Sequence, residues 1–282
     1  MNKTTSIQIT DDMQLTPEQK WNSATIANNF IFYKVMSSHP DVCKELLEIL
    51  LEIEIDKIEI HNEETVQIDY GSKGIRLDVY AKNQSQAFSL EMQTTDTREL
   101  PERSRYYQGA LDVQCLSSGQ KYKELKDSYI IFICIPDIFN KGLAFYSFEN
   151  LCREDTTIHL NDRALKYFFI ANNCDKMLNE KQKSFLSLVV GQAPSDNFTK
   201  KVATLTEEAK QNTEWKRQYM EWERQRTYDF ENGKEKGWEE ATTKAAIAFY
   251  QNGVSLDVIA KSLNLTTEKV HEIIQEKIPI QG

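Results

Sequence analysis

Proline and glycine are scarce in this sequence, with 6 and 10 copies among 282 residues, which excludes collagen-like and low-complexity chains. Histidine is also scarce, and its four copies are dispersed, which leaves little material for a histidine-rich metal site or a Ser-His-Asp triad. The cysteines are odd in number, and no two of them form a C-x-x-C pair: Cys43, Cys115, Cys134, Cys152 and Cys174. We therefore expect reduced thiols in a cytoplasmic protein, without a structural zinc ion or a disulfide framework.

Long hydrophobic runs are absent as well. The longest, Tyr129–Ile135, has seven residues, whereas a helix that crosses a bilayer needs about 20. The first residues contain no apolar segment of the kind that a secretory signal has, so we expect neither secretion nor a membrane partner. With 40% hydrophobic and 27% charged residues, the chain can form a sizeable core. The net charge of −9 disfavours non-specific adhesion to nucleic acid. A chain with this net charge can still carry local basic patches.

Hydrophobic periodicity predicts an α/β (α+β) fold, in which helices cover a mixed sheet. Ser37–Pro40 is expected to separate two helices. The turns at 71–74 and 83–86 are expected to join the first three strands. The expected strands are 57–70, 75–82, 87–93, 128–136 and 165–171, and further helices are expected over 98–117 and 175–190.

Proline usage marks a boundary near Pro194, because no proline occurs between it and Pro279, as a long helical region requires. We expect a polar N-terminal arm at 1–24, a core domain at 25–196 and a helical C-terminal region at 197–282. The C-terminal region is expected to end in a helix-turn-helix-like layout of three short helices, 245–251, 255–263 and 266–275. The last of these carries Glu268, Glu272 and Glu276, which favours protein contact over reading of a DNA groove.

Aromatic residues near the start of this region recur at helical spacing. Trp215, Tyr219 and Trp222 fall at i, i+4 and i+7 among charged residues, which is typical of a packing surface. That surface could face the core or a second copy of the chain. We expect a homodimer through the C-terminal helices, since two active centres held together are the simplest way to cut both strands of DNA.

Two carboxylates carry the chemistry that the sequence suggests. Asp78 and Glu91 fall on one face of neighbouring strands that a short turn connects. Like charges on one face repel, and a divalent cation with oxygen ligands resolves that conflict. Gln93 points the same way as Glu91 and could orient a water molecule. A solvated acidic hairpin face is the alternative interpretation of the same spacing.

A wider set of motifs resembles a known family. The motifs are Ile75-Arg-Leu-Asp-Val-Tyr80, Phe88-Ser-Leu-Glu-Met-Gln93, Arg103-Ser-Arg-Tyr-Tyr107, Ser118-Gly-Gln-Lys-Tyr122 and Tyr129–Ile135. In this order they resemble the Rpn family of bacterial recombination-promoting nucleases, also called PD-(D/E)XK nuclease family transposases. The resemblance covers roughly residues 25–200, and the segment Asn28–Lys34 is similar to the family's opening. It implies a restriction-endonuclease-like core, divalent-metal cleavage of DNA and a role in DNA recombination.

The resemblance also implies roles for individual residues. Asp78 and Glu91 match the two acids that bind Mg²⁺ or another divalent cation such as Ca²⁺ or Mn²⁺. Gln93 stands where the wider superfamily usually has lysine, so the site has one positive charge fewer. Arg103 and Tyr107 match the Arg and Tyr of the following helix, and they either contact DNA or support the acidic strands.

Two departures from the family pattern affect this interpretation. Leu77 replaces the proline of the superfamily name, which leaves the metal-binding acid in place. Asn29 stands where many relatives have an acid, which leaves Glu45 or Glu48 of the following helix as the candidate third ligand. The sequence thus predicts a metal-dependent DNA endonuclease, and the alternative is a weak or inactive nuclease-fold protein that acts as a DNA-binding or regulatory module.

Overall fold

The computed structural model describes residues 15–61, 65–66, 75–76 and 78–277. The chain forms two compact units, Met1–Arg217 and Gln218–Gly282, and each is described by itself. The sequence placed the boundary at 196/197, whereas the structure divides the chain after α7 (Asn197–Gln211), because that helix packs on the core unit through α3 (Asn29–Ser38). None of the described helices is both long enough and apolar enough to cross a membrane.

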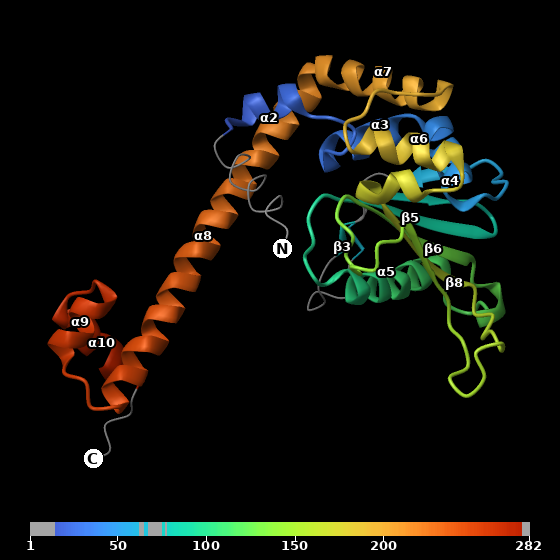
Figure 1. The fold of residues 1–282 in the computed structure, drawn as a ribbon. Helices are drawn as coiled ribbons and strands as arrows, with labels where there is room; N and C mark the ends of the chain where they lie inside the picture. The colour runs from blue at the N-terminus through green and yellow to red at the C-terminus, as the bar shows by residue number, and fades with distance from the viewer. Residues whose placement is uncertain (1–14, 62–64, 67–74, 77, 278–282) are drawn as a thin grey trace. The chain divides into compact units, whose positions relative to one another are not determined.

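A six-stranded mixed sheet forms the centre of the first unit (Figure 1). Its order is β1-β4-β5-β6-β8-β7, in which β5–β6 and β6–β8 are parallel and the other pairs are antiparallel. The strands are β1 (Glu59–His61), β4 (Val79–Lys82), β5 (Gln86–Gln93), β6 (Asp127–Cys134), β7 (Phe145–Phe148) and β8 (Ala164–Ile170). A separate pair joins β2 (Thr65–Val66) to β3 (Ile75–Arg76), and the turn expected at 71–74 lies outside the described residues.

Helices cover both faces of this sheet. Figure 1 shows α3, α4 (Pro40–Leu51) and α6 (Glu180–Val189) on one side and α5 (Leu100–Cys115) on the other. Because strand side chains alternate, Leu90 and Met92 of β5 point away from α5, whereas Ala87 packs with Leu111 of α5. Two short 3₁₀ helices, η1 (Tyr122–Glu124) and η2 (Ala171–Lys176), lie in the connections of the sheet. The predicted mixed sheet flanked by helices is therefore confirmed.

Local signals explain the N-terminal helices. The break between α3 and α4 falls at His39, just before Pro40, where proline cannot continue the preceding helix. Part of the segment expected to be a polar arm forms α2 (Pro17–Ser23) instead, with a capping box between Thr16 and Gln19. Trp21 anchors this helix, because its ring is buried and its indole N–H donates to the Lys210 carbonyl at 3.2 Å.

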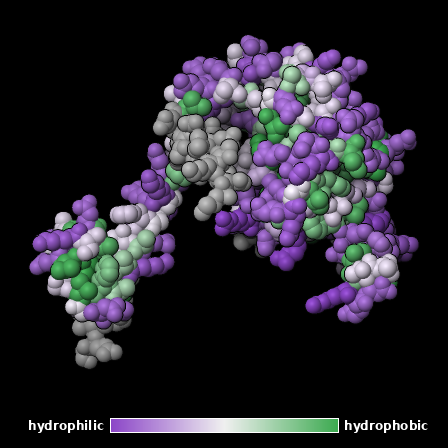
Figure 2. Space-filling view, viewed as in Figure 1, coloured by the Kyte–Doolittle hydropathy of each residue, from purple (hydrophilic) through white to green (hydrophobic). Residues whose placement is uncertain are grey.

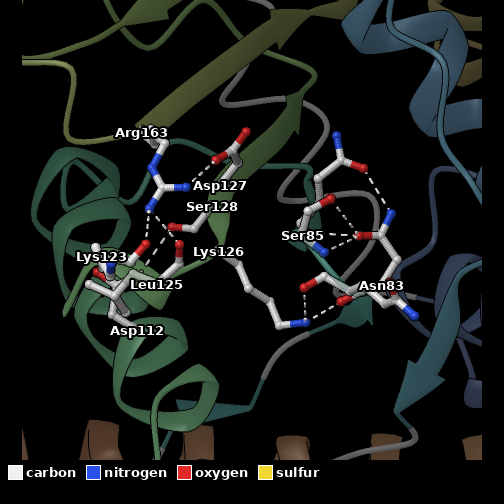
Figure 3. A network of polar contacts seen from close by, with 11 residues as sticks. Asn83, Ser85, Asp112, Lys123, Leu125, Lys126, Asp127, Ser128 and Arg163 are labelled. Carbon is white, nitrogen blue, oxygen red and sulfur yellow. Dashed lines mark hydrogen bonds and ion pairs between the residues drawn. The ribbon is translucent and has the colours of Figure 1, made fainter. Parts of the chain in front are cut away.

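A polar network fixes the end of the sheet where β6 begins (Figure 3). Arg163 donates to the Asp127 carboxylate at 3.1 Å and to the Leu125 carbonyl at 2.6 Å. Lys126 donates to the carbonyls of Asn83 and Gln84 in the β4–β5 turn. These contacts tie the turn of the hairpin to the start of β6, so the hairpin is held at its closed end.

The second unit contains helices only. It comprises the rest of α8 (Thr213–Gln251), together with α9 (Leu256–Leu263) and α10 (Thr267–Lys277). The segment 245–251, expected as a separate short helix, is the last part of α8, and it packs through Ala246 on Ile259 and Val270. In Figure 2 this unit shows hydrophobic surface between hydrophilic residues. The exposed large apolar side chains of the unit include Tyr228, Phe230, Trp238, Phe249, Tyr250 and Val258.

Candidate active site

Asp78 and Glu91 meet where β4 begins and β5 ends. Val79 pairs with Leu90 across the two antiparallel strands, so the same register places Asp78 opposite Glu91. The backbone N–H of Asp78 donates to Glu91 Oε1 at 3.0 Å, and the backbone N–H of Met92 donates to Asp78 Oδ2 at 3.0 Å. The two acids that the sequence placed on one strand face are thus neighbours, each held by the backbone of the other strand.

Glu91 is the more buried of the two acids, with 2% of its surface exposed. Its Oε1 also accepts a hydrogen bond from Ser89 Oγ at 3.1 Å, and Ser89 lies two residues earlier on the same strand face. Both recorded hydrogen bonds end on Oε1, which fixes the orientation of the carboxylate. Oε2 faces the guanidinium of Arg103, whose Nη2 lies 3.9 Å away.

Burial raises the pKa of Glu91 well above its usual value, and the neighbouring charge of Asp78 raises it further. The Asp78 backbone N–H, Arg103 and Ser89 act in the opposite direction without cancelling the shift. A divalent cation bound between the two acids would lower the pKa of Glu91, because the cation stabilises the charged form of both carboxylates.

Gln93 and Arg103 form a second layer of the site. Arg103 Nη1 donates to Gln93 Oε1 at 3.0 Å, and Gln93 Nε2 donates to the Thr95 carbonyl at 2.5 Å. Arg103 lies near the start of α5, so its side chain crosses from the helix to the end of β5. The structure therefore brings Gln93 and Arg103 together with the two acids.

Tyr107 completes this layer one helical turn after Arg103. Its hydroxyl accepts from Arg103 Nη2 at 3.0 Å, and the guanidinium lies 5.3 Å from its ring centre and 5.6 Å from that of Phe132. Burial acts to lower the pKa of Arg103, but the Tyr107 hydrogen bond and the nearby charges outweigh it, and the pKa lies above its usual value. Burial, and then the charge of Glu91, raises the pKa of Tyr107.

The candidate third ligands do not reach the acidic pair. Glu48 accepts from Lys44 Nζ at 2.6 Å and from the Ile55 backbone at 3.0 Å, and Glu45 lies 3.9 Å from Lys201. Both line a cavity of about 1180 Å³ beside α4, whereas Glu91 faces α5 across the sheet. The suggestion that Glu45 or Glu48 joins the site is therefore wrong, because α4 covers the opposite sheet face.

Asn29 does lie close to the site. Its Nδ2 donates to the carbonyl of Met92 at 3.0 Å, which ties the first turn of α3 to the strand between Glu91 and Gln93. A carboxylate could not make this bond, since it has no hydrogen to donate. The contact explains an amide at this position without giving it a role as a ligand.

The acidic pair fits a hard divalent cation. Carboxylate oxygens are the ligands that Mg²⁺ prefers, and Mg²⁺ keeps several waters when two carboxylates bind it. Among the residues that the structure describes, no three His, Cys, Asp or Glu side chains gather at one point, so Asp78 and Glu91 would hold the ion with water and phosphate oxygens.

Ser89 is a residue of the site that the sequence did not predict. The sequence already placed Ser89 on the same strand face as Glu91 and Gln93, because residues two apart on a strand share a face. Serine is compatible with many surfaces, so only the buried contact with Glu91 marks it as part of the site.

The basic residues that follow β5 are divided between the two ends of the sheet. Arg103 lies beside Gln93, whereas Lys126 binds the turn that precedes β5. Lys123 belongs to η1, on the way to the start of β6. The basic residues therefore do not form one continuous phosphate-binding face around Arg103.

Together, the mixed sheet, its covering helices and the acidic pair at the ends of β4 and β5 define a nuclease-like α/β fold. Comparison with known proteins gives the family. The model of the PD-(D/E)XK nuclease family transposases matches residues 27–246, and the chain belongs to this family. The resemblance seen in the sequence is confirmed. No curated protein and no solved structure matches the chain significantly.

Proposed function

We propose that this protein is a divalent-metal-dependent DNA endonuclease that hydrolyses phosphodiester bonds and promotes DNA recombination. The observation that carries the proposal is the contact between Asp78 and Glu91, in which a buried carboxyl with a raised pKa lies beside a second acid in a nuclease-family chain. Such pairs are typical of functional sites, because a fold gains no stability from placing like charges together.

Asp78 and Glu91 would hold Mg²⁺, or another divalent cation such as Ca²⁺ or Mn²⁺. A bound ion supplies polarisation of a phosphoryl oxygen and a lower pKa for a bound water molecule. Ser89 keeps Glu91 in one orientation, with Oε2 toward Arg103. Gln93 uses one lone pair and one N–H in its recorded hydrogen bonds, so its carboxamide retains a lone pair and an N–H with which to orient the attacking water.

The test is nicking of supercoiled plasmid DNA in magnesium buffer. Asp78→Asn and Glu91→Gln each remove one charged ligand at nearly constant shape, and each should lower the nicking rate at least about 100-fold. Glu102→Gln is the matched control, since Glu102 is an exposed carboxylate on α5. Thermal denaturation checks that the variants are folded. Full nicking by either folded site variant contradicts the assignment of these residues.

A weak or inactive nuclease-fold module is the second candidate function. The neutral side chains Gln93 and Asn29 favour it, because each occupies a place where relatives would have a charge. If the unaltered chain binds duplex DNA and fails to nick it with Mg²⁺, Mn²⁺ or Ca²⁺, this second function replaces the first.

We also propose that the protein is cytoplasmic and acts as a homodimer through its C-terminal helices. Exposed aromatic side chains on α8, at Tyr228, Phe230 and Trp238, support this proposal, because large aromatics are the residues that most often anchor an interface.

A further inference from the structure

Among the side chains that the structure describes, Arg103 is the cation that lies against the acidic pair. Its Nη2 lies 3.9 Å from Glu91 Oε2, and its side chain retains 29% exposure, so it reaches both the buried acid and solvent. It projects from α5, whereas the acids come from β4 and β5. This positive charge therefore comes from a different layer of the fold than the two negative charges.

Gln93 fixes the position of this cation. Its amide nitrogen donates to the Thr95 carbonyl at 2.5 Å, and this contact turns its amide oxygen toward Arg103 Nη1, which donates to it at 3.0 Å. A lysine in place of Gln93 would bring its own charge to the end of β5. Gln93 instead holds a charge that arrives from the helix.

The guanidinium is fixed without being saturated. A guanidinium has five N–H donors, and the recorded hydrogen bonds to Gln93 and Tyr107 use two of them. The rings of Tyr107 and Phe132 restrict its plane from distances of 5.3 and 5.6 Å. A fixed, partly exposed guanidinium with remaining donors suits a phosphate group, which it can bind through two parallel hydrogen bonds.

We propose that Arg103 binds the non-bridging oxygens of the DNA phosphodiester at the acidic pair, and that Gln93 is the positioning residue that holds it there. This inference rests on the proposed nuclease function, since it assigns the phosphate contact of that same site. The competing interpretation is that Arg103 only neutralises Glu91 and packs on Tyr107.

The experiment measures binding of a short fluorescent DNA duplex by anisotropy in the presence of a chelator, over a series of salt concentrations. Arg103→Gln should weaken binding about tenfold, as expected for loss of a charge-assisted hydrogen bond. It should also reduce the slope of log K against log salt by about 0.9, the value for one lost phosphate contact. A purely structural arginine would change thermal stability and leave this slope unaltered.

Arg105→Gln is the matched control, because it removes the same charge from an exposed position two residues along α5. It should leave affinity and slope nearly unchanged. In the double variant Gln93→Lys/Arg103→Gln, a charge returns to the end of β5, and the slope should recover. Parent affinity and slope in folded Arg103→Gln, or an equal loss in Arg105→Gln, would overturn the proposal.

Arg103→Lys covers the case in which Arg103→Gln does not fold, since it keeps the charge beside Glu91. Weaker binding with the parent salt slope then supports the phosphate contact, and unchanged binding refutes it. Plasmid nicking by the parent chain, run in parallel, separates the two proposals. If the parent chain nicks DNA and Arg103→Gln binds DNA normally, the phosphate contact of Arg103 is refuted and the nuclease function stands. If the parent chain does not bind DNA, both the nuclease function and the phosphate contact are refuted.

Discussion

The response of the site to pH depends on the burial of one side chain, Glu91. Water cannot stabilise the charged form of this carboxyl, and the charge of Asp78 opposes ionisation further, so the folded chain favours the protonated acid. A carboxyl whose pKa is raised on folding contributes stability at low pH and loses that contribution as the pH rises through its folded pKa. Without a divalent ion, ionisation of Glu91 therefore opposes folding.

Glu91→Gln should remove this pH dependence, because glutamine keeps the shape and stays neutral. In chelator, the melting temperature of the parent should fall relative to that of the variant as the pH rises from about 5 to about 8. Each pKa unit of elevation corresponds to about 1.4 kcal/mol, which is a melting-temperature shift of about 3–6 °C for a folded domain of roughly 200 residues. Melting curves at several pH values check this. A constant difference between the two chains across that range would contradict the raised pKa.

Among the structural elements, the β4–β5 hairpin was the most predictable from the sequence. Strand side chains alternate with a period of two, so Asp78 and Glu91 could be placed on one face once the turn at Asn83 was recognised. Likewise, Arg103 and Tyr107 could be placed on one helix face from their spacing alone. Local geometry was sufficient for both.

Other elements depend on contacts that a local pattern does not contain. β7 is a four-residue strand at the edge of the sheet, where it pairs with β8. Its residues do not alternate regularly between polar and apolar, so the sequence did not predict a strand there. The contacts of Asn29 with Met92 and of Gln93 with Thr95 join side chains to backbone carbonyls, which no residue pattern specifies. The capping box at Thr16 was readable, and it would have identified α2.

At the scale of the whole molecule, the contacts of α7 stabilise the first unit, Met1–Arg217. Phe198 and Val202 of this helix are buried, and Lys201 bonds the Asp41 carboxylate at 2.8 Å. A chain that ends at Gly191 loses all three contacts and exposes the apolar surface beneath them. The helix therefore has to remain in any shortened chain that is meant to keep the fold.

A chain shortened to residues 1–217 should melt within a few degrees of the parent core transition. A chain shortened to residues 1–191 should lose several kcal/mol of stability, as for deletion of large buried side chains. Light scattering on the same samples tests the proposed dimer: the full chain should be dimeric and the 1–217 chain monomeric. A dimeric 1–217 chain would place the interface elsewhere, and equal melting of the two shortened chains would contradict the role of α7.

The exposed middle of α8 has a consequence for how the intact protein survives in a cell extract. From Arg224 to Ala241 its residues are exposed apart from the half-buried Asn232, and Gly233 and Gly237 would meet no atom within 4 Å if they carried a Cβ. Helical glycines cost about 1 kcal/mol each relative to alanine, so this segment should open locally far more often than the core unfolds.

Such local opening exposes the backbone beside Arg226, Lys234 and Lys236 to trypsin. Dilute trypsin should therefore cut this stretch of the second unit first, and the products should be one fragment that carries the sheet and one that carries α9 and α10, as mass spectrometry would show. Gly233→Ala together with Gly237→Ala should slow this cut about tenfold or more. Gly109→Ala, which adds the same methyl group to α5 without a clash, should not slow it. First cuts inside the sheet-containing unit would contradict this view, in which the exposed middle of α8 sets the lifetime of the uncleaved chain.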